Sequence, residues 1–260
     1  MLLILTGDVQ IGKTRWLQNA VTRLEEAGVP CRGVLAPGTW IEKADGSFEK
    51  TGIDNLLLPG HEIVPFARRA DLARKDGLFD AESQAGRAQL KWHISDEAIA
   101  RVNGHLRALR ESGAEPPAES EHENHSDGMK ACACGSPNSP YGMPVESHAP
   151  QRKASVRADA CPPADARSFA REGTTRKAVL FIDELGQLEL MHDGGLTEAV
   201  ALLEQGPRDR YEHAVVIARD KFDLPERVRR RFGAKWGGSA CIAPDDGAWH
   251  AWVEPLLERL

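Results

Sequence analysis

The sequence lacks the features that would place it in a membrane or a secreted class. No run of apolar residues approaches the roughly 18 that a membrane helix needs, and the first residues carry no basic stretch typical of an export signal. The five cysteines are an odd number, which favours reduced thiols over a disulfide framework. We therefore expect a cytoplasmic protein that has no membrane partner.

An excess of positive charge is also absent. The 260 residues carry 33 Lys and Arg against 39 Asp and Glu, a formal net charge of −6. A global basic field for nucleic acid or anionic lipid is therefore missing, and a nucleic-acid partner is disfavoured. The composition, with 41% hydrophobic and 28% charged residues, is that of an ordinary globular protein.

One long segment is poor in the residues that build a core. Residues 112–176 contain no Leu, Ile or Trp and only two Val, but hold eight of the sixteen prolines. Such a segment cannot bury enough apolar surface to offset the entropy lost on ordering. We predict a disordered, low-complexity insertion at 112–176, and a single domain built from residues 1–111 and 177–260.

The two parts that flank this segment alternate between expected strands and helices. The expected strands are Leu2–Leu5, Cys31–Ala36, Asn55–Leu58, Ala178–Ile182, Ala214–Ala218 and Ala240–Ala243, with a hairpin that joins Trp40–Ile41 to Phe48–Thr51. The expected helices are Thr14–Ala27, Ser95–Arg110, Thr197–Gln205, Pro225–Phe232 and one from Asp245 or Asp246 to Leu260. This alternation predicts an α/β fold with a mostly parallel sheet flanked by helices.

The first chemical motif lies between the first strand and the first helix. The pattern G-x-x-x-x-G-K-[ST] matches the eight residues Gly7, Asp8, Val9, Gln10, Ile11, Gly12, Lys13 and Thr14. In such a loop, backbone N–H groups and the helix N-terminus surround the phosphates of a nucleotide. Lys13 would add a full positive charge, and the Thr14 hydroxyl is placed to coordinate Mg²⁺. We therefore expect these residues to bind a nucleoside triphosphate.

The second motif is an apolar strand that ends in two acidic residues, Asp183 and Glu184. We expect Asp183 to hold Mg²⁺, directly or through a water. On an extended backbone Glu184 would project to the opposite side, where it could accept a proton from the water that attacks the γ-phosphate. A strand followed by an acidic turn is common, and it is the phosphate loop that makes this functional interpretation the better one.

Phosphoryl transfer usually recruits a further cation. Arg219 follows the strand Ala214–Ala218 and is preferred to Arg68 or Arg69, because parallel strands end at the ligand face of a sheet. A solvated arginine is an equally good interpretation of Arg219. Glu189 could belong to the site or support the turn after the strand, and the structural role is favoured. The predicted catalytic residues are thus Lys13, Glu184 and Arg219.

Residues 183–190, DELGQLEL, resemble a known signature, D-E-[IL]-G-x-[ML]-E-L. It belongs to the small P-loop nucleoside triphosphatases of thermophilic type, which are related to the human cancer-related nucleoside triphosphatase. The resemblance extends to the phosphate loop, to residues 33–52 and to Val215–Arg219. It implies a RecA-like core, Mg²⁺ as cofactor, and slow hydrolysis of ATP, GTP and other nucleoside triphosphates to the diphosphate and phosphate.

Departures from this family mark a diverged member. Gln10 stands where the family usually has a glycine, and Arg15 stands where a second threonine usually follows the Lys-Thr pair. Residues 37–40, PGTW, occupy the place of an acidic segment that carries an arginine, so the resemblance implies no site residue there.

Other functions stay open at this point. A nucleotide or small-molecule kinase would need a basic lid, for which the sequence offers Arg68, Arg69, Arg74, Lys75 and Arg87. The adjacent acids Asp183 and Glu184 suit activation of water better than transfer to an acceptor. A nucleotide-gated module that works through an unidentified protein partner would have almost the same sequence. A nucleic-acid motor is disfavoured by the charge. The preferred base and the oligomeric state are not indicated.

Overall fold

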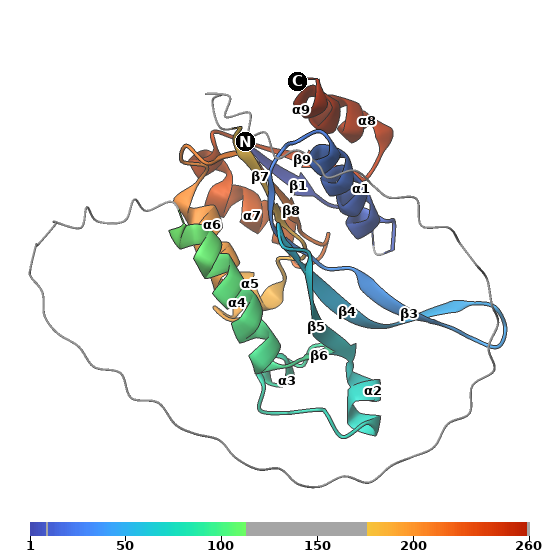
Figure 1. The fold of residues 1–260 in the computed structure, drawn as a ribbon. Helices are drawn as coiled ribbons and strands as arrows, with labels where there is room; N and C mark the ends of the chain where they lie inside the picture. The colour runs from blue at the N-terminus through green and yellow to red at the C-terminus, as the bar shows by residue number, and fades with distance from the viewer. Residues whose placement is uncertain (9, 113–175, 259–260) are drawn as a thin grey trace, which may run out of the picture. The chain divides into compact units, whose positions relative to one another are not determined.

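The computed structural model describes residues 1–8, 10–112 and 176–258 (Figure 1). The predicted insertion lies outside these described residues except for its two end residues, and Val9 of the phosphate loop lies outside them too. The described residues build one nine-stranded sheet with helices on both faces, which confirms the predicted α/β class. Over these ranges, no helix combines the length and the apolar character that crossing a bilayer requires.

Five neighbouring strands form the parallel part of the sheet. Their order is β2 (Cys31–Leu35), β7 (Ala178–Ile182), β8 (Tyr211–Ile217), β1 (Leu2–Leu5) and β9 (Ser239–Ile242). All side chains of β1 and β7 are buried, as expected of parallel strands that are covered on both faces. Because the five strands run the same way, the phosphate loop after β1 and the acidic pair after β7 leave from the same edge, with β8 between them.

The other strands are antiparallel. β4 (Phe48–Leu58) pairs with β2, and it also pairs with β3 (Gly38–Glu42) and β5 (Glu62–Arg69), which in turn pairs with β6 (Trp92–Ile94). The sequence pattern predicts a hairpin arm and a separate strand where the structure has the continuous β4, and it does not predict β5 or β6. Pro65 lies inside β5 and argues against a strand, but the β4–β5 register shifts next to its partner Asp54, and such irregular positions accept proline.

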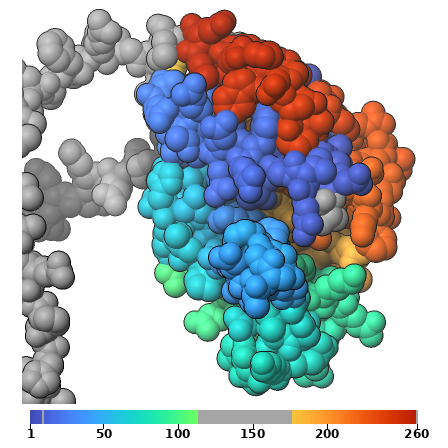
Figure 2. Space-filling model, turned by 90° about the vertical axis from the view of Figure 1, so that its right-hand side faces the viewer, coloured from blue at the N-terminus to red at the C-terminus, as the bar shows by residue number. Residues whose placement is uncertain are grey.

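The β3–β4 hairpin extends past the edge of the parallel strands. Leu56–Leu58 of β4 pair with Leu35–Gly33 of β2, so the earlier residues of β4 continue beyond the C-terminal end of β2. The tip is closed by the Lys43 N–H, which donates to the Ser47 carbonyl. The hairpin projects from the body in Figure 1 and faces the reader in Figure 2, below the dark blue N-terminal residues. It thus leaves the sheet on the side of the phosphate loop.

The core has two halves, one on each face of the sheet. α4 (Asp96–Glu111), α6 (Thr197–Gln205) and α7 (Leu224–Phe232) pack on the face that buries Leu2 and Ile4. α1 (Lys13–Glu26) and the C-terminal helices α8 (Asp246–Ala248) and α9 (Glu254–Leu257) pack on the face that buries Leu3 and Leu5. The alternation of side chains along β1 therefore fixes it between two helical layers.

The predicted helices are present, with differences at the C-terminus. Ser95 Oγ accepts a hydrogen bond from the Ala98 N–H, which is the predicted N-cap of α4. Asp245, rather than Asp246, caps α8 by accepting from the Ala248 N–H. The last expected helix is interrupted by a π-helical turn over Trp249–Val253. Short helices that the sequence did not predict are α2 (Ala70–Lys75), α3 (Gln84–Arg87), α5 (Gln187–Met191) and the 3₁₀ turn Gly233–Trp236.

Candidate functional site

The phosphate loop connects β1 to α1, as the motif predicts. Gly7 has φ 123°, a backbone conformation that strains any residue with a side chain. Gly12 is the N-terminal cap of α1 and has φ 94°. Gln10 also adopts a left-handed conformation, with φ 68°. The glycine that the resembling family has at this position would fit the same backbone without a steric penalty.

The Lys13 ammonium lies over the loop rather than in solvent. Its Nζ donates to the carbonyl oxygens of Gly7 at 2.9 Å and of Asp8 at 2.6 Å. Burial, followed by the neighbouring Arg219 cation, lowers the pKa of Lys13, and the carboxylates of Glu184 and Asp183 oppose this shift. The side chain that should meet the terminal phosphates is therefore held at the loop by two neutral acceptors, and it has no ion pair among the described residues.

Asp183 is buried at the end of β7, next to the loop. Its Oδ2 accepts a hydrogen bond of 2.9 Å from the Ala36 N–H after β2, while its Oδ1 has no hydrogen-bond partner among the residues described. Burial, followed by the charge of Glu184, raises the pKa of Asp183 to about 7, against the opposing effects of the Ala36 bond and the nearby Thr14 hydroxyl. The carboxyl thus has one oxygen anchored by the sheet and one oxygen free.

Thr14 and Asp183 suit a magnesium ion that is bound together with a nucleotide. Mg²⁺ is usually held by one or two protein oxygens, with substrate phosphates and waters completing its shell. The buried, unpartnered Oδ1 of Asp183 and the neighbouring Thr14 hydroxyl offer such oxygens. No group of three or more His, Cys, Asp or Glu side chains in the described ranges could hold a metal ion alone. The residues therefore fit a metal that arrives with phosphate.

Glu184 faces Arg219 across the ends of β7 and β8. The Arg219 Nη2 donates to both carboxylate oxygens, at 2.7 and 2.8 Å, and both side chains are about one-third exposed. The expectation that Glu184 continues an extended backbone is wrong, because its φ is 67° and the chain turns after Ile182. The Leu185 N–H donates to the Ile217 carbonyl and ties this turn to β8. Turn geometry, rather than strand alternation, thus orients Glu184.

The other arginines considered for the site have partners elsewhere. Arg68 pairs with Asp76, and Arg69 pairs with Glu49 and Asp71. These contacts join β5 to α2 and to the hairpin. Arg74 stacks on the Phe79 ring, and Arg87 donates to the Glu82 carbonyl. The four arginines of the set suggested for a kinase lid are therefore engaged in local contacts, whereas Arg219 lies beside the acidic pair.

Glu189 has the structural role that the sequence analysis favoured. Its Oε2 accepts from the Gly186 N–H and its Oε1 from the Leu196 N–H, both at 2.9 Å. The carboxylate thus holds together the two ends of the segment that contains α5. Burial raises the pKa of Glu189, and these backbone bonds oppose the shift. Because both oxygens bind backbone, Glu189 is not placed to act on a substrate.

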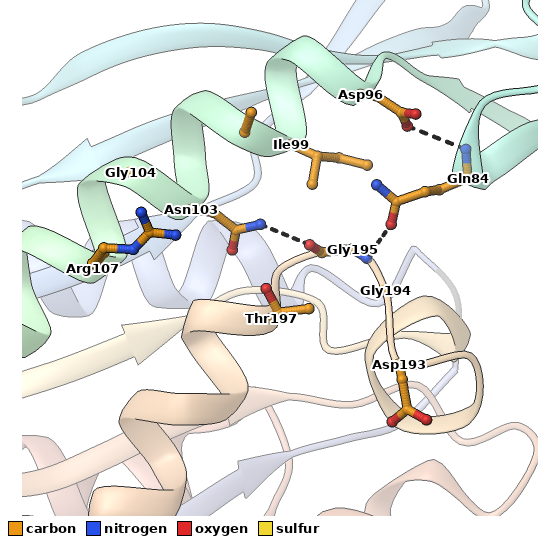
Figure 3. A pocket seen from close by; sticks show the side chains of 11 residues that line it. Gln84, Asp96, Ile99, Asn103, Gly104, Arg107, Asp193, Gly194, Gly195 and Thr197 are labelled. Carbon is orange, nitrogen blue, oxygen red and sulfur yellow. Dashed lines mark hydrogen bonds between the residues drawn. The ribbon is translucent and has the colours of Figure 1, made fainter.

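A cavity of about 400 Å³ lies beside this segment, between α3, α4 and the turn before α6. Figure 3 shows two side chains that reach Gly195 from opposite sides. The Gly195 N–H donates to Gln84 Oε1 at 2.8 Å, and Asn103 Nδ2 donates to the Gly195 carbonyl at 2.9 Å. The lining of the cavity includes none of the phosphate-loop residues and neither residue of the acidic pair. These polar groups hold the turn, and the cavity is separate from the edge of the sheet where the two motifs meet.

One cation near the site was not singled out from the sequence. Lys50 lies in β4, and its charge acts on Asp183. The lysine belongs to a strand far from both motifs, and no local pattern distinguishes it from the other charged residues of the hairpin. Only the pairing of β4 with β2 reveals that it reaches the edge where the motifs meet.

No protein-family model and no curated protein matches the sequence. Among solved structures, a human cancer-related nucleoside triphosphatase matches with a TM-score of 0.48 and 15% identity, over 99% of this chain and 95% of that chain. THEP1 from the hyperthermophile Aquifex aeolicus matches with a TM-score of 0.47 and 13% identity, over 100% of this chain and 99% of that chain. Both structures are of nucleoside triphosphatase type by name or by the motif resemblance noted above, and the likeness is a distant one that assigns no activity to this chain.

Proposed function

We propose that the protein is a Mg²⁺-dependent nucleoside triphosphatase that hydrolyses ATP, GTP or a related triphosphate to the diphosphate and phosphate. The observation that carries this proposal is the meeting of two distant motifs at one edge of the sheet. Lys13 and Thr14 follow β1, and Asp183 and Glu184 follow β7. A phosphate loop alone would support binding, whereas a loop beside two carboxylates supports hydrolysis.

In this proposal the loop binds the phosphates, and the Lys13 ammonium leaves its two carbonyl acceptors for a phosphate oxygen. Its two present partners are neutral carbonyls, so a phosphate oxygen would be a stronger partner for the ammonium. Thr14 and the free oxygen of Asp183 would hold Mg²⁺, which neutralises charge on the β- and γ-phosphates when it is bound. The buried position of Asp183 excludes bulk water from that side of the site.

Glu184 and Arg219 have different roles in the chemical step. Glu184 accepts the proton of the attacking water, and Arg219 meets the negative charge that the γ-phosphoryl group carries during transfer. In the structure the two side chains bind each other. A triphosphate competes with Glu184 for the arginine, so binding of substrate also frees the base.

The proposal is tested by phosphate release from purified protein supplied with a nucleoside triphosphate and Mg²⁺ alone. We expect turnover that disappears in Lys13→Ala and when the metal is chelated. The Lys13→Ala variant should also lose nucleotide affinity, because a charge-assisted contact contributes about 1.5–3 kcal/mol. Release only with an added acceptor would indicate a kinase, and release only with a protein partner would indicate a gated module. Unchanged nucleotide affinity in Lys13→Ala would reject the phosphate-loop assignment.

A further inference from the structure

Lys50 is brought to the proposed site by the architecture of the antiparallel strands. It pairs with Trp40 in the β3–β4 hairpin, in the part of β4 that continues beyond the C-terminal end of β2. β2 is the strand next to β7, which carries Asp183 at its own C-terminal end. The hairpin therefore carries a lysine from outside the parallel strands toward the edge where the phosphate loop and the acidic pair lie.

The Lys50 side chain is fixed by its packing. The stem crosses Gly38, where an added Cβ would lie 2.6 Å from the Lys50 Cε and 3.2 Å from its Nζ. The ammonium lies 5.4 Å from the centre of the Trp92 ring on β6, and the side chain is half-buried. Glycine at position 38 thus makes room for the lysine, and an aromatic face supports its charge.

Lys50 differs from the other cations of the hairpin region because it has no carboxylate within ion-pair distance among the described residues. The other cations of residues 38–69 all have carboxylate partners within ion-pair distance: Lys43 with Glu49, Arg68 with Asp76, and Arg69 with Glu49 and Asp71. Lys50 has no such partner among the described residues, although the charges of Glu184, Arg219 and Asp183 all act on it. Burial is the main cause that lowers the pKa of Lys50.

An unpaired, half-buried ammonium is an unfavourable arrangement unless an anion completes it. The anion that this edge of the sheet is proposed to receive is a nucleoside triphosphate. Lys13 and Arg219 approach from the parallel strands, whereas Lys50 comes from the hairpin. Three cations from three elements would then surround the terminal phosphate group, beside the two carboxylates that handle the metal and the proton.

We propose that Lys50 is a catalytic residue whose ammonium contacts the γ-phosphate of the bound triphosphate, and that it makes the site selective for triphosphates over diphosphates. This inference rests on the proposed function. In the step, a water oxygen bonds to the γ-phosphorus, its proton passes to Glu184, and the bond from phosphorus to the β–γ bridging oxygen breaks. Charge moves onto the leaving diphosphate, and Lys50 stabilises the γ-phosphoryl oxygens while this happens.

The test compares Lys50→Met, which keeps an unbranched apolar stem over Gly38 and Trp92, with Lys50→Arg, which keeps the charge. Lys43→Ala is the matched control, since Lys43 lies on the same hairpin and already pairs with Glu49. We expect Lys50→Met to lower kcat roughly 100-fold, the usual effect of losing one transition-state donor. Lys50→Arg should recover part of this loss, and Lys43→Ala should keep the wild-type rate.

Binding of a non-hydrolysable triphosphate analogue and of the diphosphate, measured by calorimetry, provides the second readout. Lys50→Met should weaken the analogue about tenfold and leave the diphosphate within twofold, because only the former reaches the ammonium. Equal losses for both ligands, or a wild-type kcat in Lys50→Met, would overturn the inference. Thermal melting shows whether the variants fold. If Lys50→Met does not fold, Lys50→Arg and Lys50→Gln are measured in the same two assays.

The two proposals fail in different ways. If Lys13→Ala and Glu184→Gln abolish hydrolysis while Lys50→Met does not, the triphosphatase stands and the role of Lys50 is wrong. If the wild-type protein releases no phosphate under any condition, the triphosphatase is wrong. The difference in affinity between the triphosphate analogue and the diphosphate, compared between wild type and Lys50→Met, then still decides whether Lys50 contacts the γ-phosphate.

Discussion

At the scale of the residue, the buried carboxyl of Asp183 links stability to function. A folded-state pKa of about 7 lies well above that of an exposed aspartate. Between about pH 4 and pH 7 the unfolded chain has released this proton while the folded chain retains it. The free energy of unfolding therefore falls as the pH rises through this window, by up to about 1.4 kcal/mol per pH unit.

Asp183→Asn should remove this contribution. Without nucleotide and metal, we expect the variant to melt at a higher temperature than the wild type at pH 8 and to approach it at pH 4. The same substitution should weaken the binding of Mg²⁺, so that turnover needs a higher concentration of the metal. Glu189, whose pKa is also raised, stays in both proteins, so the measurement is the difference between their melting temperatures across pH. Parallel curves would mean that Asp183 is ionised in the folded protein throughout this range.

Glu184 is predicted to matter for chemistry and not for binding. Glu184→Gln keeps the shape of the side chain and one oxygen for Arg219, but it removes the base. We expect nucleotide affinity in the presence of Mg²⁺ to stay within a few-fold of wild type while turnover falls by about 10²–10⁴-fold. Single-turnover kinetics separate the two quantities. If turnover survives, another group activates the water, and Glu189, with both oxygens bound to backbone, is a poor replacement.

Gln10 is strained by the loop that it helps to form. A non-glycine residue in the left-handed region costs about 1–2 kcal/mol, whereas glycine adopts it freely but loses more entropy on folding. We expect Gln10→Gly to keep nucleotide affinity and to change stability by less than about 1 kcal/mol. Gln10→Val should weaken both, because a β-branched residue tolerates this conformation poorly. Chemical denaturation and nucleotide titration check the pair, and similar behaviour of the two variants would show that backbone strain at Gln10 is unimportant.

The residue scale also shows what the sequence could predict. Motif spacing, together with the apolar strand before each motif, predicts that five residues lie at one edge of the sheet: Lys13, Thr14, Asp183, Glu184 and Arg219. The sequence could not predict the turn that orients Glu184, because φ depends on how the segment after β7 bonds to β8. Lys50 was missed because its position follows from strand pairing across the sheet and not from any local pattern.

At the scale of the element, the pairing of β2 with β7 leaves no room for a side chain at Gly33. Gly33 has φ 118°, and a Cβ there would lie 2.0 Å from the Phe181 carbonyl oxygen. Gly33→Ala should therefore separate the strand that carries Asp183 from the strand whose Ala36 N–H anchors it. We expect a loss of more than about 3 kcal/mol in unfolding free energy, within the range of severe single substitutions.

Gly28→Ala is the control for that prediction. Gly28 also has a positive φ, 69°, but an added Cβ would have no atom within 4 Å. Its cost should be the conformational one alone, about 1 kcal/mol. Chemical denaturation of the two variants separates steric contact from backbone conformation. Equal losses would mean that the β2–β7 contact relaxes without cost.

The strands that the sequence predicted are those with continuous apolar runs. β1 and β7 are buried on both faces, and such runs are visible without any knowledge of their partners. β5 and β6 are half-exposed, short or interrupted by Pro65; β5 forms on the edge that β4 offers, and β6 on the edge that β5 offers. Elements that depend on a neighbour for their stability are those that local patterns do not predict.

At the scale of the whole molecule, Arg210 joins the two ends of the domain that flank residues 113–175. Its guanidinium donates to the carbonyl oxygens of Leu109 and Arg110, near the end of α4. Its own carbonyl accepts from the Ala178 N–H, at the start of β7. The two flanks are therefore held together by contacts of the domain itself. Asp183 lies at the other end of β7, about 17 Å away for five strand residues.

We therefore predict that replacing residues 115–173 with a short Gly/Ser linker leaves triphosphatase activity nearly intact. Loop-closure entropy changes slowly with length, so the shorter chain should gain only about 1 kcal/mol in unfolding free energy. Protease should cut the wild-type chain first within this segment, with the two fragments remaining associated through the sheet, because β2 and β8 both pair with β7. Steady-state phosphate release and thermal melting compare the shortened variant with the full chain. A variant that melts normally but has lost hydrolysis would show that the segment contributes to the site, and the single domain formed by residues 1–111 and 177–260 would then be incomplete as a catalyst.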